Sequence, residues 1–73
     1  MDYRVEEIAT AAGVRVDTLR FYQSQKLLPP PRKQGRVAIY GDDHLDRLGR
    51  IRDLKNEGFT LAQIREKVRL HTR

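Results

Sequence analysis

The residue types best suited to chemistry lie in one short segment that contains Thr18, Arg20, Phe21 and Tyr22. An arginine can hold guanine O6 and N7 with two hydrogen bonds or clamp a phosphate, and a tyrosine hydroxyl can donate to a phosphate oxygen. A phenylalanine can pack against a sugar or a thymine methyl group. These groups suit a surface that binds DNA, and they do not form a catalytic constellation.

A helix through this segment separates its residues into two faces, because successive side chains are turned by about 100°. One face collects Val16, Leu19, Gln23 and Leu27. The opposite face collects Asp17, Thr18, Phe21 and Tyr22. We therefore expect the second set to point away from the domain's own core. Arg20 falls on the flank, where pairing with an acid inside the domain is an alternative, and the aromatic pair could instead pack on other elements.

A second group of cations, Arg32, Lys33 and Arg36, lies in a proline- and glycine-rich stretch that contains no acid. The whole chain carries a net charge of +5 and a pI near 10.1, which favours a polyanionic partner such as nucleic acid. Phosphate contacts from these cations would position the protein without reading sequence, and a solvated basic loop is the alternative. The Tyr40 hydroxyl either reaches a phosphate or caps the core, and Arg4 is a weaker candidate.

Two short helices joined by a glycine turn are expected over residues 5–25. The apolar residues of the first helix recur at helical spacing, namely Val5, Ile8, Ala9 and Ala12. Gly13 then stands where a helix ends in the left-handed conformation, and the second helix is expected from Val16 to Gln25. This is the helix-turn-helix pattern, although any small helical hairpin with a glycine turn shares its spacing.

The middle of the chain is expected to form a wing, meaning a two-stranded hairpin over residues 32–40. Pro29–Pro31 cannot continue the preceding helix, because proline lacks the backbone N–H and its ring clashes with the turn before it. Gly35 supplies a turn signal, and the run from Val37 to Tyr40 is rich in β-prone residues.

A second helical pair is expected over residues 42–70. Leucine and isoleucine recur there at spacings of three, and Gly58 ends the third helix. Thr60 and Gln63 then match the T-x-x-Q capping box that begins a helix. The predicted fold is a single mainly α domain over residues 1–73, a winged helix-turn-helix with four short helices and a small two-stranded wing.

Several classes of function lack the residues that they need. The chain has no cysteine, and His44 and His71 are far apart without ligand-like neighbours, so we expect no metal site. No glycine-rich phosphate loop, nucleophile elbow or paired-carboxylate constellation occurs, and Asp42-Asp43 is more simply a helix start, so we expect no enzyme, no catalytic residue and no cofactor. The sequence shows no signal-peptide core and no membrane span, which makes a cytoplasmic protein with no membrane partner the expectation.

Two functions of different classes fit these residues. The first is sequence-specific binding of double-stranded DNA, with the second helix in the major groove and the wing on phosphates. The second is a small protein-interaction module, an adaptor or an anti-regulator, in which Phe21 and Tyr22 are the anchors. Aromatic residues and arginine are enriched among interface hot spots, which is the basis of this alternative.

Three separate motifs follow one another and together cover nearly the whole chain. The first comprises Ala11-Ala12-Gly13-Val14 and Val16 through Tyr22; the second is Leu27-Leu28-Pro29 with Arg32, Gly35 and Tyr40; the third is Leu54 through Gly58-Phe59-Thr60-Leu61 with Ile64. In this order they resemble the helix-turn-helix signature, the wing and the junction of the third and fourth helices in the MerR family of bacterial transcription regulators. The resemblance is to the N-terminal DNA-binding domain of that family.

This resemblance implies a winged helix-turn-helix in which the second helical pair acts as another wing. It also implies transcription regulation by binding pseudo-palindromic, double-stranded promoter DNA, which is distorted so that RNA polymerase can engage it. The family's dimerisation and effector regions follow such a domain and are absent from residues 1–73. We therefore expect a monomer for this chain and a homodimer for a longer form.

Four positions depart from the family's usual pattern. Arg15 stands where a capping serine is common, which weakens the start of the second helix and adds a phosphate contact. Gln23 replaces a usual acid, and Lys26 replaces a usual glycine. Ala38 replaces an arginine of the wing, and Arg36 is expected to take over that contact from the other face of the strand. The predicted DNA-binding residues are Arg15, Asp17, Thr18, Arg20, Phe21, Tyr22, Arg32, Lys33, Arg36 and Tyr40.

Overall fold

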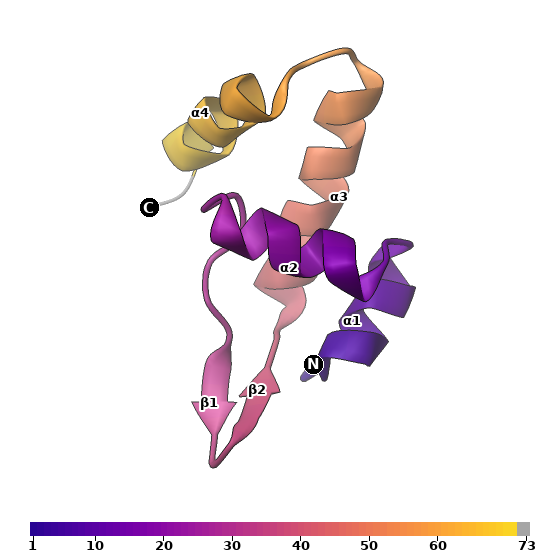
Figure 1. Ribbon diagram of the computed structural model, residues 1–73, viewed down its shortest axis with the longest axis vertical. Coiled ribbons are helices and arrows are strands. Elements are labelled where there is room, and N and C mark those ends of the chain that lie inside the picture. Colours follow the sequence, from indigo (N-terminus) through magenta and orange to yellow (C-terminus); the bar gives the residue numbers. More distant parts are fainter. Residues whose placement is uncertain (72–73) are drawn as a thin grey trace.

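Four helices and one hairpin make up the computed structural model, which describes the backbone of residues 1–71 and the side chains of residues 1–69 (Figure 1). In chain order the elements are α1 (Val5–Ala12), α2 (Val16–Ser24), β1 (Arg32–Gln34), β2 (Val37–Ile39), α3 (Asp42–Asn56) and α4 (Leu61–His71). This order confirms the predicted fold class of four short helices with a two-stranded wing. None of the helices in the described part of the chain has the length and apolar content that crossing a membrane requires.

A tight turn at Gly13 joins α1 to α2. The apolar face of α1 buries Ile8, Ala9 and Ala12, as predicted. Gly13 adopts a φ of 73°, a left-handed conformation that glycine tolerates because it has no Cβ. The N–H of Val14 then closes the turn on the Ala9 carbonyl at 2.9 Å. The predicted helix-turn-helix is confirmed, with α2 ending one residue earlier than expected.

The chain leaves α2 through Lys26, whose φ is 61°. Among the described residues it is the one non-glycine residue with positive φ, at the position where the MerR pattern usually has glycine. The N–H of Leu27 donates to the Tyr22 carbonyl at 2.9 Å across this turn. Leu27 and Leu28 then bury their side chains in the core, and Pro29–Pro31 lead out to the wing.

The wing projects away from the helices at the bottom of Figure 1. Its strands β1 and β2 pair antiparallel, with Lys33 opposite Ala38, and Gly35 turns between them with a φ of 66°. Tyr3 and Tyr40 exchange backbone hydrogen bonds of 2.8 Å in both directions, which adds the N-terminal segment to the end of the wing. Because a two-stranded hairpin is marginal by itself, such attachments decide where it lies.

α3 and α4 form the second helical pair, joined by a turn at Gly58 with a φ of 98°. The capping box is present with both of its bonds. Gln63 N–H donates to Thr60 Oγ1 at 3.1 Å, and Thr60 N–H donates to Gln63 Oε1 at 2.9 Å. Ile64 and Val68 carry α4 into the core.

One hydrophobic core joins all four helices. Its largest fully buried side chains are Ile8, Leu19, Leu27, Leu48, Ile51, Ile64 and Val68. Tyr22 belongs to the same core at 5% exposure, so the prediction that it points away from the core is wrong. The reason is that the side of α2 that carries Leu19 and Tyr22, one turn apart, faces the shared core, and Tyr22 lines the same small hollow as Leu48 and Arg52 of α3. Gln23, predicted on the core face, is only half-buried.

Candidate nucleic-acid interface

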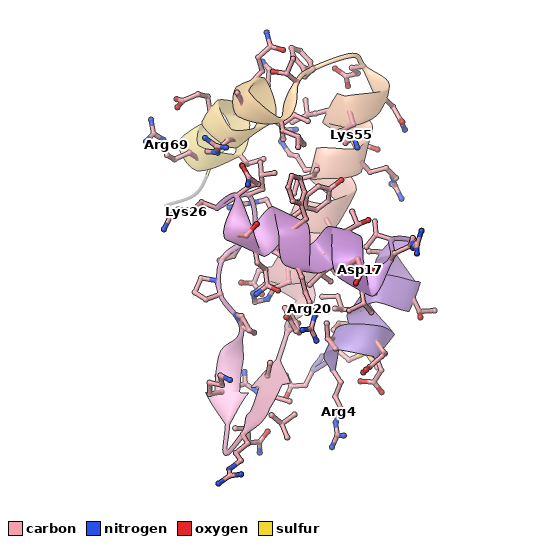
Figure 2. The ribbon with its side chains drawn as sticks, in the orientation of Figure 1. Arg4, Asp17, Arg20, Lys26, Lys55 and Arg69 are labelled. Atoms are coloured by element: carbon pink, nitrogen blue, oxygen red, sulfur yellow. The ribbon has the colours of Figure 1, made fainter. Side chains whose placement is uncertain are left out.

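The exposed side of α2 carries Arg15, Asp17, Arg20 and Phe21. Figure 2 shows Asp17 on the near side of α2 and Arg20 extending from the same helix toward the wing. Phe21 is 47% exposed, as predicted, and its ring is tilted against that of Tyr22 at a centroid distance of 6.3 Å. A polar and aromatic surface therefore remains on α2 even though Tyr22 has turned inward.

The first turn of α2 lacks a side-chain cap. Arg15 is the N-cap residue, with φ −80° and ψ 153°, and its side chain makes no capping hydrogen bond. Because the first N–H groups of a helix have no acceptor within the helix, those of α2 stay open beside a guanidinium. Thr18, in the same turn, is half-buried, so it is less exposed than predicted.

Arg20 forms no ion pair with a carboxylate of residues 1–69, so the alternative of an internal pairing is wrong for this part of the chain. Its charge acts on Tyr40 instead. Burial raises the pKa of Tyr40, while the hydrogen bond to Gln23 and the charge of Arg20 oppose that rise. The Tyr40 hydroxyl donates to Gln23 Oε1 at 3.0 Å, and the residue is 3% exposed. The sequence left open whether the Tyr40 hydroxyl reaches a phosphate or caps the core, and the structure shows the side chain in the core.

The cations of the wing are exposed, and one of them has a partner. Arg32 Nη2 lies 3.0 Å from Asp2 Oδ2, with both side chains more than half exposed. Such surface pairs are worth little, so a phosphate can replace Asp2 at small cost. Lys33 and Arg36 make no ion pair with any described residue.

A hollow of about 600 Å³ lies between α1, α2 and the wing. The charged side chains among the described residues that line it are four cations, Arg4, Arg20, Lys33 and Arg36, and one acid, Glu6. A concave surface with this excess of positive charge attracts a polyanion. Sequence reasoning ranks Arg4 low, because only the Tyr3–Tyr40 bridge shows that the N-terminal segment runs beside the wing.

Ala38 and Arg36 line this hollow together. Arg36 lies in the turn before β2 and not on the strand itself, so the expectation that it acts from the other face of the strand stays a prediction. Ala38 is half-buried and leaves space where the MerR pattern has an arginine. Arg36, at the turn, supplies a positive charge on the same side.

Other kinds of site find little support. The protein-interaction alternative relied on Phe21 and Tyr22 as exposed anchors, and the burial of Tyr22 removes one of them. Within the described residues, no three His, Cys, Asp or Glu side chains gather where they could hold a metal ion.

Comparisons with known proteins agree with this geometry. The family model described as "MerR HTH family regulatory protein" matches residues 3–70. The mercuric resistance operon regulatory protein of Serratia marcescens is 43% identical over 63 residues, which cover 85% of this chain and 44% of that protein. The HTH-type transcriptional regulator ZntR of Escherichia coli K12 is 38% identical over 65 residues, which cover 88% of this chain and 46% of that protein.

Solved structures show the same likeness. The transcription regulator PbrR691 from Ralstonia metallidurans CH34, in complex with lead(II), superposes with a TM-score of 0.89 at 39% identity, over 96% of this chain and 55% of that one. HiNmlR, a MerR family regulator lacking the sensor domain and bound to promoter DNA, has a TM-score of 0.86 at 30% identity, over 97% of this chain and 55% of that one. The chain spans about half the length of the relatives that it matches.

Proposed function

Because the chain belongs to the MerR family of helix-turn-helix regulators, we propose that it binds double-stranded promoter DNA sequence-specifically in bacterial transcription regulation. The observation that carries this proposal is the hollow between α2 and the wing, which Arg4, Arg20, Lys33 and Arg36 line with a single acid among the described residues. A second support is the related HiNmlR structure, which contains promoter DNA.

Base reading is assigned to α2, because an α-helix fits the major groove. The side chains that α2 offers at or near its surface include Asp17, Thr18, Arg20 and Phe21. Arg20 can hold guanine with two bonds, Asp17 can accept from cytosine N4, and Phe21 can pack on a thymine methyl group. The buried Tyr22 and Tyr40 support this surface from inside the domain.

Phosphate contacts are assigned to the wing and to the start of α2. Lys33 and Arg36 have no acidic partner among the described residues, and Arg32 joins them by exchanging Asp2 for a phosphate. Arg15 acts together with the open N–H groups of α2, since the N-terminus of a helix favours anions. These contacts set the register of the domain on DNA and carry no sequence information themselves.

A longer form of the protein acts, in this proposal, as a homodimer on a pseudo-palindromic promoter in the cytoplasm. It affects RNA polymerase through the promoter rather than by catalysis. These inferences rest on family membership, since the relatives are transcriptional regulators.

The test starts from duplexes selected by this chain from a randomised library, because such a selection finds preferred sequences without a chosen operator. Arg36→Ala should weaken binding to all selected duplexes alike and lower the log–log salt slope by about one. Arg20→Ala should cost about 1–3 kcal/mol and relax the preference at one or two base pairs. Fluorescence anisotropy over a salt series measures both quantities.

Arg69→Ala is the matched control, because it removes one positive charge from α4, away from the wing (Figure 2). It should leave base preference unchanged and affect affinity far less than Arg36→Ala. A library selection that yields no preferred sequence, or equal losses for Arg36→Ala and Arg69→Ala, would contradict the proposed function.

A further inference from the structure

The imidazole of His44 is buried, at 6% exposure. It stands in the first turn of α3, and both of its ring nitrogens have backbone partners. Nδ1 lies 3.0 Å from the Gly41 nitrogen. Nε2 lies 3.1 Å from the Pro29 carbonyl oxygen and 3.2 Å from that of Pro30. The proposed DNA contacts do not involve this side chain.

These partners determine the protonation state of the ring. The Gly41 N–H can only donate, so Nδ1 accepts and carries no proton. The proline carbonyls can only accept, so Nε2 carries the proton. The geometry therefore requires a neutral imidazole with its hydrogen on Nε2.

The partners of His44 belong to the two stalks of the wing. Pro29 and Pro30 precede β1, whereas Tyr40 and Gly41 follow β2. The rings of His44 and Tyr40 also make an edge-to-face contact, with a centroid distance of 5.2 Å and an interplanar angle of 81°. One imidazole thus joins the entrance and the exit of the hairpin to α3.

We propose that neutral His44 is a positioning residue that holds both stalks of the wing to α3, and that its protonation loosens the wing at the Gly41 stalk and weakens DNA binding. The DNA-binding part of this inference rests on the proposed function. A proton on Nδ1 would set two N–H groups against each other at 3.0 Å, which breaks the bond to Gly41, whereas Nε2 keeps its bonds to the proline carbonyls. A released wing leaves fewer molecules competent to bind, and the apparent affinity falls in proportion.

The charged and titratable groups around the ring allow this exchange. Asp43 Oδ1 lies 3.3 Å from Nδ1 and offers the protonated ring a new acceptor. On the same helix, Arg47 is occupied by the Leu27 carbonyl at 2.9 Å. The wing contributes Tyr40, whose environment includes the charge of Arg20 on α2. The proline stalk presents its backbone carbonyls to the ring.

The predicted direction separates this inference from simple electrostatics. Histidine is the side chain that ordinarily changes charge between pH 5 and 8. Added positive charge on a DNA-binding domain should strengthen binding to a polyanion as the pH falls. Release of the wing predicts the opposite, namely weaker binding at the lower pH.

The experiment measures the dissociation constant for a library-selected duplex at pH 8.0 and pH 5.5 and at one salt concentration. Wild type should bind about fivefold more weakly at pH 5.5, the size expected for a lost buried hydrogen bond. His44→Asn keeps an acceptor for the Gly41 N–H but cannot titrate, so its affinity should not fall between these pH values. His71→Asn, which removes the other histidine of the chain, should behave as wild type.

A readout without DNA keeps the two proposals separate. Imidazole ¹⁵N NMR should show His44 protonated on Nε2 at pH 8.0. Hydrogen exchange of the Gly41 and wing amides, corrected for intrinsic rates, should accelerate about fivefold at pH 5.5 in wild type and not in His44→Asn. If His44→Asn does not fold, His44→Gln gives the same comparison, because its amide keeps a donor for the proline carbonyls.

The possible outcomes distinguish the role of His44 from the proposed function. Equal pH profiles for wild type and His44→Asn, or wing amides that exchange alike at both pH values, overturn the role of His44. If no duplex binds at either pH while the wing amides still open at pH 5.5, the proposed function fails and the positioning of the wing stands.

Discussion

The two helical pairs of this domain are built alike but completed differently. Each pair is joined at a left-handed glycine, Gly13 or Gly58. The second helix of the second pair begins with a complete capping box from Thr60 and Gln63. The second helix of the first pair, α2, has Arg15 as its N-cap residue, and the Arg15 side chain makes no capping hydrogen bond. The cap is thus complete in the pair that lies away from the basic hollow, and it is missing at α2, the helix beside the hollow. A missing cap is expected where a site needs open N–H groups.

The largest effects test whether the two pairs share one core. Leu19→Ala in α2 and Ile64→Ala in α4 should each lower the free energy of unfolding by about 3 kcal/mol, because both side chains are fully buried. Urea unfolding followed by circular dichroism should show a single transition in each variant. Thr10→Ala, at an exposed position, should stay within about 0.5 kcal/mol of wild type. Separate melting of α4 in the Ile64 variant would mean that the pairs are independent units.

The caps should respond with opposite signs. Thr60→Ala should lower the free energy of unfolding by about 1 kcal/mol, because it removes the acceptor for Gln63 N–H. Arg15→Ser should raise it by about 0.5–1 kcal/mol, because serine can cap α2. The same Arg15→Ser change should weaken DNA binding and reduce the salt slope by about one. Thermal unfolding and salt titrations measure the two effects, and stronger DNA binding by this variant would refute the comparison.

The C-terminal ends of α2 and α3 also differ. Lys26 holds a φ of 61° after α2, whereas glycine takes the left-handed position after α3. Lys26→Gly should therefore raise the free energy of unfolding by about 1 kcal/mol. Lys26→Ala is the control and should gain much less, because alanine keeps the Cβ that makes the conformation costly. Chemical denaturation measures the difference, and equal gains would exclude backbone strain as its cause.

The smallest effect concerns Tyr40, which follows β2 and whose hydroxyl donates to Gln23 of α2. Burial raises its pKa above 10.0 in the folded protein, so the unfolded chain loses this proton first as the pH rises. The resulting stability is fully present below pH 10 and is lost as the pH rises through the folded-state pKa. Tyr40→Phe should flatten this alkaline loss in unfolding curves recorded from pH 8 to 11. An unchanged profile for Tyr40→Phe would remove the tyrosine from this linkage.

Much of the fold was predictable because its signals are local. Gly13, Gly58 and Thr60 act on their own turn of backbone, and each does what its residue type predicts. The exposed, basic character of the wing also follows from composition. The positions of individual site residues were less predictable, since Arg4 joins the hollow only through a strand pairing between distant segments.

The sequence by itself determined the order and type of the helices and the wing, and that the protein is basic, because turns, caps and charge depend on neighbouring residues. Only the tertiary structure decided which side of α2 is buried, because Tyr22 packs into the core that the four helices share. It also decided that His44 lies inside the domain, bonded to both stalks of the wing. Those contacts join residues far apart in the chain, and no local pattern records them.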